Sequence, residues 1–309
     1  MPKKFKVYIS LTAIVSLVLI EVSVRALGFV DFPVYDLDAE IKYIPSANQS
    51  GRFMNENDWY FNDKSMPVRE NWNPVGKKNI LLIGNSIVMG GNPYMQSDKL
   101  VSQIQVRLSS DNKVWPIAVG GWNQSNEIAY LKRHPEIATE AGYVAWEYGA
   151  GGLSRATPWR GDYVFPSHKP ICATWYVLRR YVLPRFFPGY SAMQLSELPA
   201  TGDAEAANLE EFERQLKTLT MAIKQDHHGI IWLYPSSAQA EIAKRGKEWL
   251  PERPKVEKLA KSYGLRVVDV AANAEWTGTL YRDGVHPTIE GNKVLASILA
   301  SEIMRDLER

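Results

Sequence analysis

Residues 79–86 have the sequence NILLIGNS, a short unbroken apolar run that ends in Gly84, Asn85 and Ser86. Apolar runs of this length, bounded by turn residues, are typical of a strand that is buried on both faces of a parallel sheet. Helical patterns separate this run from four later ones of the same kind, which are Val114–Val119, Tyr143–Glu147, Gly229–Tyr234 and Arg266–Val270. The alternation predicts an α/β fold with a three-layer, doubly wound sheet of about five parallel strands.

Two of the helical patterns are particularly clear. One has apolar residues three or four positions apart, which predicts a helix with a single buried stripe formed by Leu209, Phe212, Leu216, Leu219 and Ile223. The other predicts a final helix from about Ile289 to Leu307, with Thr288 as its N-cap directly after Pro287.

The N-terminal segment has the composition of a membrane anchor. Residues 7–20 are uncharged, and the apolar character continues to about residue 30, which is roughly the length that crosses a bilayer. Glu21 and Arg25 can pair on one helix face near the end of the span. Because three lysines precede the run, residues 1–28 are expected to form a transmembrane helix with a cytoplasmic N-terminus and an extracytoplasmic, for instance periplasmic, body. A cleaved signal peptide is the alternative.

Two further segments differ from the alternating pattern. Residues 29–77 are rich in Asn, Asp, Pro and aromatic residues without clear periodicity, so a connecting arm is expected there. Residues 78–309 form the expected sheet domain, interrupted at about 154–208 by an insertion rich in aromatic residues and arginine. The insertion is expected either to cap the active face or to pack locally as a subdomain.

Three residues can form a nucleophilic site. Ser86 follows the first strand of the sheet, and open α/β sheets bind their ligands at the carboxyl ends of their strands. Asp283 and His286 lie on one short loop just before the last helix. A neutral imidazole can take the serine proton while the carboxylate orients the ring, so these residues predict a Ser-His-Asp catalytic set.

Together, these motifs resemble the SGNH (GDSL-type) hydrolase family, over about residues 79–309 without the insertion. Its first block, Gly-Asp-Ser, matches Gly84-Asn85-Ser86, and its last block, Asp-x-x-His, matches Asp283 to His286. The resemblance implies a flavodoxin-like fold and an oxyanion hole formed by the N–H groups of Ser86 and Gly121.

The third block of the family departs from this pattern. It normally supplies an oxyanion-binding Asn, but the matching stretch, Glu147 to Gly152, contains no Asn, and Gly151 is at about its position. Asn123 is the amide nearest in sequence to the predicted oxyanion hole, although it is also placed to cap the following helix. The enzyme is therefore expected to be slow, inactive, or supplied with another donor.

The composition restricts which classes of partner and cofactor are expected. The net charge is only +2, without a long basic run, which does not favour nucleic acid. A single cysteine excludes an internal disulfide, and we expect neither a metal site nor a cofactor. Ten Trp and fifteen Tyr suit stacking on sugar rings or contact with lipid.

The resemblance implies a serine esterase that hydrolyses or transfers ester-linked acyl groups, and outward-facing relatives often act on O-acetyl groups of a cell-surface polysaccharide. A lipase or thioesterase that acts on acylated lipid is the enzymatic alternative. The alternative from another class is a non-catalytic carbohydrate-binding or assembly protein of an export complex.

Overall fold

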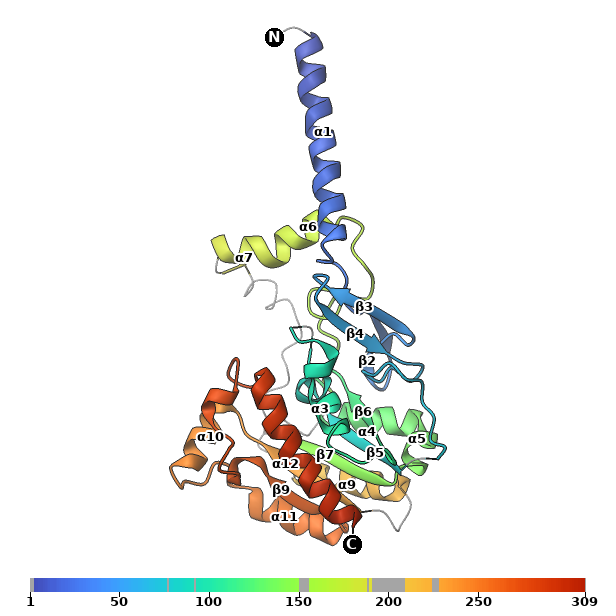
Figure 1. The fold of residues 1–309 in the computed structure, drawn as a ribbon, viewed down its shortest axis with the longest axis vertical. Coiled ribbons are helices and arrows are strands. Elements are labelled where there is room, and N and C mark those ends of the chain that lie inside the picture. The colour runs from blue at the N-terminus through green and yellow to red at the C-terminus, as the bar shows by residue number, and fades with distance from the viewer. Residues whose placement is uncertain are drawn as a thin grey trace.

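The computed structural model describes residues 3–76, 78–91, 93–149, 156–187, 189–190, 209–223 and 228–308. Its centre is a sheet of five parallel strands (Figure 1), which are β5 (Lys78–Gly84), β6 (Asn112–Ala118), β7 (Tyr143–Gly149), β8 (His228–Tyr234) and β9 (Arg266–Asp269). The order across the sheet is β6-β5-β7-β8-β9. Ile80 of β5 is paired with Val114 of β6 on one side and with Tyr143 of β7 on the other. All five predicted strands are confirmed. The strand order switches side at β5: the next strand, β6, is added on one side of β5, and the strands from β7 onward are added on the other.

Helices cover both faces of the sheet. Around the sheet lie α2 (Ser86–Met89), α3 (Leu100–Gln105), α4 (Gln124–Arg133), α5 (Pro135–Thr139), α9 (Leu209–Ala222), α10 (Ser237–Lys244), α11 (Arg253–Ser262) and α12 (Ile289–Leu307), with 3-10 turns at Gln96–Asp98, Val270–Ala272 and Gly278–Leu280. Helix α3 packs against α12, whereas α4, α5, α9 and α11 form a second packed group. Both predicted helices are confirmed: α9 buries Phe212, Leu216 and Leu219, and Thr288 caps α12.

The central strands are almost completely inaccessible to solvent. Ile80, Leu81, Leu82 and Ile83 of β5 are each 0% exposed. This burial explains why the sequence of β5 is uniformly apolar rather than alternating. The strand ends where Gly84 and Asn85 turn the chain toward Ser86.

The N-terminal helix α1 (Lys3–Ala26) extends away from the rest of the molecule (Figure 1). Its side chains at Leu11, Ile14, Val18 and Val22 are all exposed. Within the part of the chain that the structure describes, however, no helix has both the length and the apolar character required to cross a membrane. The structure therefore supports a helix at Lys3–Ala26, within the predicted residues 1–28, but not the predicted transmembrane span.

Residues 29–77 are more ordered than expected. They contain two antiparallel hairpins (Figure 1), β1 (Tyr35–Asp38) with β2 (Lys42–Pro45), and β3 (Gln49–Phe53) with β4 (Asn57–Phe61). Ile41 and Tyr43 are 0% exposed and belong to the same apolar core as the sheet. The segment is thus packed on the sheet domain, and its short strands gain their stability from this packing.

The described part of the insertion contains α6 (Ala173–Val177), a π-helical turn (Leu178–Val182) and α7 (Leu183–Phe186). The Glu21 carboxylate of α1 accepts hydrogen bonds from the N–H groups of Ala173 and Thr174, each at 2.8 Å, and so stabilises the start of α6. Figure 1 shows α6 beside the end of α1. The expected cap over the active face is therefore not supported by these helices, and residues 154–155, 188 and 191–208 lie outside the described part.

Candidate active site

Ser86 is the first residue of α2, directly after the β5 strand. Asn85 is the N-cap, and its Oδ1 accepts a hydrogen bond of 3.0 Å from the Ile87 N–H. A side chain at Gly84 would not fit, because its Cβ would lie 2.3 Å from Oε2 of Glu147. The close approach of β7 therefore explains the glycine, and the turn presents Ser86 where the strand order reverses.

His286 lies within hydrogen-bond distance of both Ser86 and Asp283. Nε2 of His286 is 3.0 Å from Oγ of Ser86, and Nδ1 of the same ring is 2.9 Å from Oδ2 of Asp283. The sequence placed these residues at two different ends of the sheet domain, and the fold brings them together. The arrangement allows His286 to act as a base toward Ser86.

The loop that carries His286 is held by contacts on both sides. The hydroxyl of Tyr234 donates to the Val285 carbonyl at 2.8 Å, and the hydroxyl of Tyr94 donates to the Pro287 carbonyl at 2.9 Å. Neither tyrosine was identified from the sequence. Both fix the imidazole relative to Ser86 through the backbone.

Asp283 is poised to remain ionised. Burial alone would raise its pKa, but hydrogen bonds from the N–H groups of His286 and Val285, together with the His286 ring, lower the pKa to about 2. The carboxylate is therefore charged at neutral pH and can stabilise an imidazolium at His286.

The loop after β6 lies against the turn that carries Ser86. A Cβ added to Gly120 would be 4.0 Å from the Cβ of Ser86, and Gly121 has a φ of +79°, a conformation that favours glycine. The Gly120 N–H donates to the Met89 sulfur at 3.1 Å. Within the described part of the chain, neither the Ser86 N–H nor the Gly121 N–H donates a backbone hydrogen bond.

Residues of the N-terminal hairpin support this loop. The Tyr43 hydroxyl donates to the Gly120 carbonyl at 2.9 Å, and Trp122 Nε1 donates to the Tyr43 carbonyl at 3.0 Å. The Tyr43 ring also stacks on Phe165, with ring centroids 4.4 Å apart. The segment expected to be only a connecting arm thus positions one wall of the site.

Asn123 has a structural role in the described residues. Its Oδ1 accepts hydrogen bonds from Ser125 and Asn126 at the start of α4, and the Asn126 side chain binds the Asn123 N–H in return. The prediction that its amide donates to an oxyanion stays a prediction. Residues 150–152, which include the predicted position of the missing third-block Asn at Gly151, lie outside the described part of the chain.

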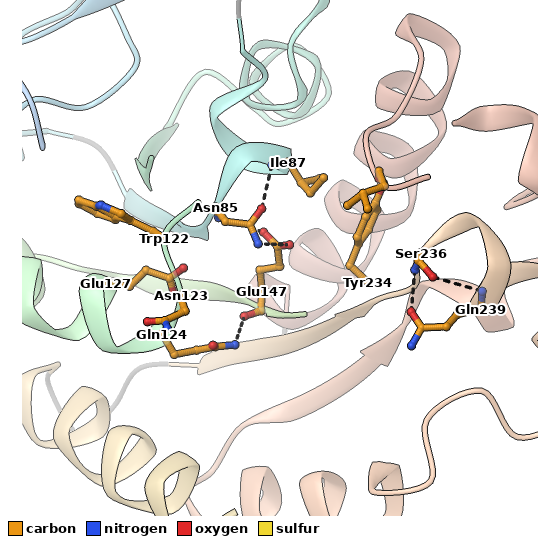
Figure 2. Close-up of a pocket in the computed structure, with 11 residues that line it drawn as sticks. Asn85, Ile87, Trp122, Asn123, Gln124, Glu127, Glu147, Tyr234, Ser236 and Gln239 are labelled. Carbon is orange, nitrogen blue, oxygen red and sulfur yellow. Dashed lines mark hydrogen bonds between the residues drawn. The ribbon is translucent and has the colours of Figure 1, made fainter. Parts of the chain in front are cut away.

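A cavity of about 240 Å³ adjoins the turn that carries Ser86 (Figure 2). It is lined by Asn85, Ile87, Trp122, Asn123, Gln124, Glu127, Glu147, Tyr234, Ser236, Gln239 and Val285. Asn85 and Ile87 flank Ser86, and Val285 precedes His286, so the cavity adjoins the turn that carries Ser86 and the loop that carries His286, although neither of these two residues is part of its wall. It is large enough for a small acyl group or another small substituent.

Glu147 is one of several polar residues of this cavity that the sequence did not identify as functional. Its side chain is buried on β7 and points toward Asn85 (Figure 2). Burial raises the pKa of Glu147 to about 7, although hydrogen bonds from Asn85 oppose the rise. A carboxylate inside an apolar strand is the only sequence signal that could have marked it, because buried charges need specific partners.

The described ranges contain no candidate metal site. Within them, no three or more His, Cys, Asp and Glu side chains are grouped so that they could hold a metal ion. The arrangement around Ser86 consists of groups that transfer protons and form hydrogen bonds.

No protein-family model matches the sequence, and no curated protein matches it significantly. Several solved structures are similar to this chain. One is an esterase EstA from Pseudoalteromonas sp. inhibited by monoethylphosphonate, with 12% sequence identity and a TM-score of 0.44. Two others are a lipolytic G-D-S-L family member from Veillonella parvula (10% identity, TM-score 0.43) and a carbohydrate acetylesterase family member from Sinorhizobium meliloti (15% identity, TM-score 0.40). The alignments cover 75%, 74% and 75% of this chain and 100%, 98% and 100% of those chains, respectively.

Proposed function

We propose that this protein is a serine esterase of the SGNH type, which acts on ester-linked acyl groups through Ser86, His286 and Asp283. The observation that carries the proposal is a pair of hydrogen-bond contacts made by the His286 ring. Its Nε2 lies 3.0 Å from Ser86 Oγ, and its Nδ1 lies 2.9 Å from Asp283 Oδ2. It lies at the carboxyl edge of the sheet, where the strand order reverses. The proposal follows from this geometry and not from the distant structural matches.

In the proposed reaction, Ser86 Oγ attacks the ester carbonyl carbon while His286 Nε2 takes the serine proton. The carbonyl electrons move to the oxygen, and the N–H groups of Ser86 and Gly121 stabilise the resulting oxyanion. The bond to the leaving oxygen then breaks, the leaving alcohol takes the proton from His286, and an acyl-Ser86 ester remains. Water, or an acceptor hydroxyl, attacks this ester with the same proton transfers and releases the acid or a new ester.

We propose that the acyl group is short, with O-acetyl groups of a cell-surface polysaccharide as the substrate. The cavity beside Ser86, at about 240 Å³, is smaller than the roughly 300 to 1,000 Å³ of most sites for drug-sized ligands. Trp122 and Tyr234 in its wall offer aromatic surface to such a substrate. A long acyl chain would need additional space.

We also propose that the sheet domain works outside the cytoplasm and that α1 holds it at a membrane. The support is the lysine-rich start of the chain and the exposed apolar side chains of α1. Acylated carbohydrate, or lipid in the alternative reading, would then be encountered at the cell surface.

A serine-directed fluorophosphonate probe and two model esters test the catalytic proposal. We expect the probe to label Ser86 and the protein to hydrolyse p-nitrophenyl acetate and acetylated polysaccharide, but not p-nitrophenyl palmitate. Ser86→Ala should abolish both labelling and turnover without unfolding, since Ser86 lies on a partly exposed turn. Ser301→Ala, at an exposed position of α12, is the matched control and should behave like the unaltered protein.

The outcomes separate the alternatives. Turnover that survives in Ser86→Ala would refute the assignment of the nucleophile. Preference for the palmitate ester would favour a lipase. Neither labelling nor turnover in the unaltered protein would favour a non-catalytic carbohydrate-binding or assembly protein.

A further inference from the structure

We propose that Glu147 is a positioning residue that acts through Asn85 to hold Ser86 and the first turn of α2 in their reactive arrangement. The inference deepens the proposed function and rests on it. Glu147 does not contact the reacting atoms in this scheme. Its role is to orient the side-chain amide of Asn85, which stands where the family motif has Asp.

The contacts between the two residues are specific. Oε2 of Glu147 accepts a hydrogen bond of 3.2 Å from the Asn85 backbone N–H, and Oε1 accepts one of 3.0 Å from Nδ2 of Asn85. Figure 2 shows the two side chains facing each other beneath the start of α2. Glu147 is 3% exposed, and the close approach at Gly84 leaves the carboxylate little freedom to move.

The orientation of the Asn85 amide matters on its other side. Because Nδ2 points to Glu147, Oδ1 points to the start of α2, where it accepts the Ile87 N–H at 3.0 Å. The Ser86 hydroxyl lies 3.4 Å from the same oxygen. A rotation of the amide by half a turn would place two donors against each other at Ile87 and would remove the N-cap next to the nucleophile.

The pairing is complementary only in its present form. When Glu147 is ionised, as it is above its raised pKa of about 7, its carboxylate is only an acceptor and matches the two donors of Asn85. Glu147→Gln places an amide donor against Asn85 Nδ2, and Asn85→Asp places one carboxylate against another in a buried position. The double variant Asn85→Asp with Glu147→Gln exchanges the roles, because the amide at 147 can then donate to the carboxylate at 85 and still accept the backbone N–H.

The exchange is the test, performed on the whole protein with p-nitrophenyl acetate. We expect each single variant to lower kcat by about tenfold or more with little change in KM, because small displacements of a nucleophile are costly. The double variant should be faster than either single variant. Unchanged kcat in Glu147→Gln, or a double variant slower than both single variants, would overturn the proposal.

A control separates positioning from general stability. Asp306 is also a nearly buried carboxylate that accepts side-chain hydrogen bonds, but its partners Tyr143 and Arg266 lie at the amino-terminal edge of the sheet. Asp306→Asn should lower the melting temperature and leave kcat unchanged well below that temperature. If Glu147→Gln behaves in the same way as Asp306→Asn, the residue has only a structural role and the proposal is wrong.

A second measurement does not depend on turnover. Hydrogen exchange of the Ile87 amide reports the N-cap directly, and we expect its protection to fall in Glu147→Gln and to return in the double variant. If the unaltered protein has no esterase activity, the proposed function fails while this exchange still decides the positioning. Equal protection in all variants would overturn the positioning even in an active enzyme.

Discussion

Asn123 is the residue at which two predicted roles can be separated by one substitution. Its Oδ1 caps α4, and the residue also lines the cavity beside Ser86. Ser is as good an N-cap as Asn but carries no amide. If the amide supplies an oxyanion donor, Asn123→Ser should lower turnover by about a hundredfold or more with a nearly unchanged melting temperature.

Asn123→Ala completes the comparison, because it removes the cap as well and should cost about 1 kcal/mol of stability. Turnover of Asn123→Ser equal to that of the unaltered protein would leave Ser86 and Gly121 as the two proposed donors among the described residues. The enzyme would then be expected to be slow.

The two buried carboxyls beside the cavity should make stability depend on pH. Burial raises the pKa of Glu127 to about 8 and that of Glu147 to about 7, from an ordinary value of 4.5. Between pH 4.5 and about 8 the folded state therefore binds more protons than the unfolded state, so the free energy of unfolding falls as pH rises and levels off above this window. This direction is opposite to that of an ion-paired carboxylate such as Asp283.

We expect Glu127→Gln to weaken the decline, measured by denaturant unfolding at about pH 5 and about pH 8. The amide oxygen can still accept the Trp146 indole N–H, which donates to Glu127 at 2.6 Å, so the hydrogen bond is kept while the titration is removed. An equal decline in the variant would contradict the assignment.

At the scale of elements, the β1–β2 hairpin holds the loop that follows β6. Tyr43→Phe removes the hydroxyl that donates to the Gly120 carbonyl, and we expect a loss of about 1 kcal/mol in stability together with slower turnover. Melting curves and kcat measured on the same preparation check this. Unchanged values for both would mean that the hairpin does not position the loop.

The variant Gly121→Ala tests the same contact between Tyr43 and the loop from the side of the loop. Its Cβ would lie 2.9 Å from the Tyr43 hydroxyl, in a backbone conformation that is already unfavourable for alanine. Adding Tyr43→Phe should recover part of the lost stability by removing the clash, while the backbone strain remains.

The strands of the central sheet could be predicted because each is a local feature. Residues such as Ile80 to Ile83 form a continuous apolar run between turn residues, and this pattern needs no knowledge of distant contacts. The two N-terminal hairpins could not be predicted in this way. Their strands are only four or five residues long, and Tyr43 is buried by a loop 77 residues away in sequence.

The same distinction applies to the candidate site. Ser86, Asp283 and His286 stand next to recognisable elements, so their sequence positions predicted that they could meet. The proposed role of Glu147 could not be recognised, because it depends on contact with Asn85, which lies 62 residues earlier, directly after the neighbouring strand β5. Asn123 was predicted to be either a cap or a donor, and the structure establishes the cap.

At the scale of the whole molecule, the untested prediction concerns the side of the membrane. We expect a reporter that is active only outside the cytoplasm to be active when fused after Arg309, because the lysines at the start of α1 favour a cytoplasmic N-terminus. Replacing Lys3, Lys4 and Lys6 with Glu should reduce this activity. An inactive fusion to the unaltered chain, with a cytoplasmic reporter active in its place, would contradict the proposed location.

The distance along the chain between the nucleophile and its base affects when the protein becomes reactive. Ser86 and His286 are 200 residues apart, so the ribosome must add this length of chain after Ser86 before the two can meet. Closing so long a loop is entropically costly, and parallel sheets with such contacts tend to fold slowly. In the proposed mechanism, the newly made chain therefore carries an unactivated serine until the His286 segment has been made and α12, the helix that follows it, has docked.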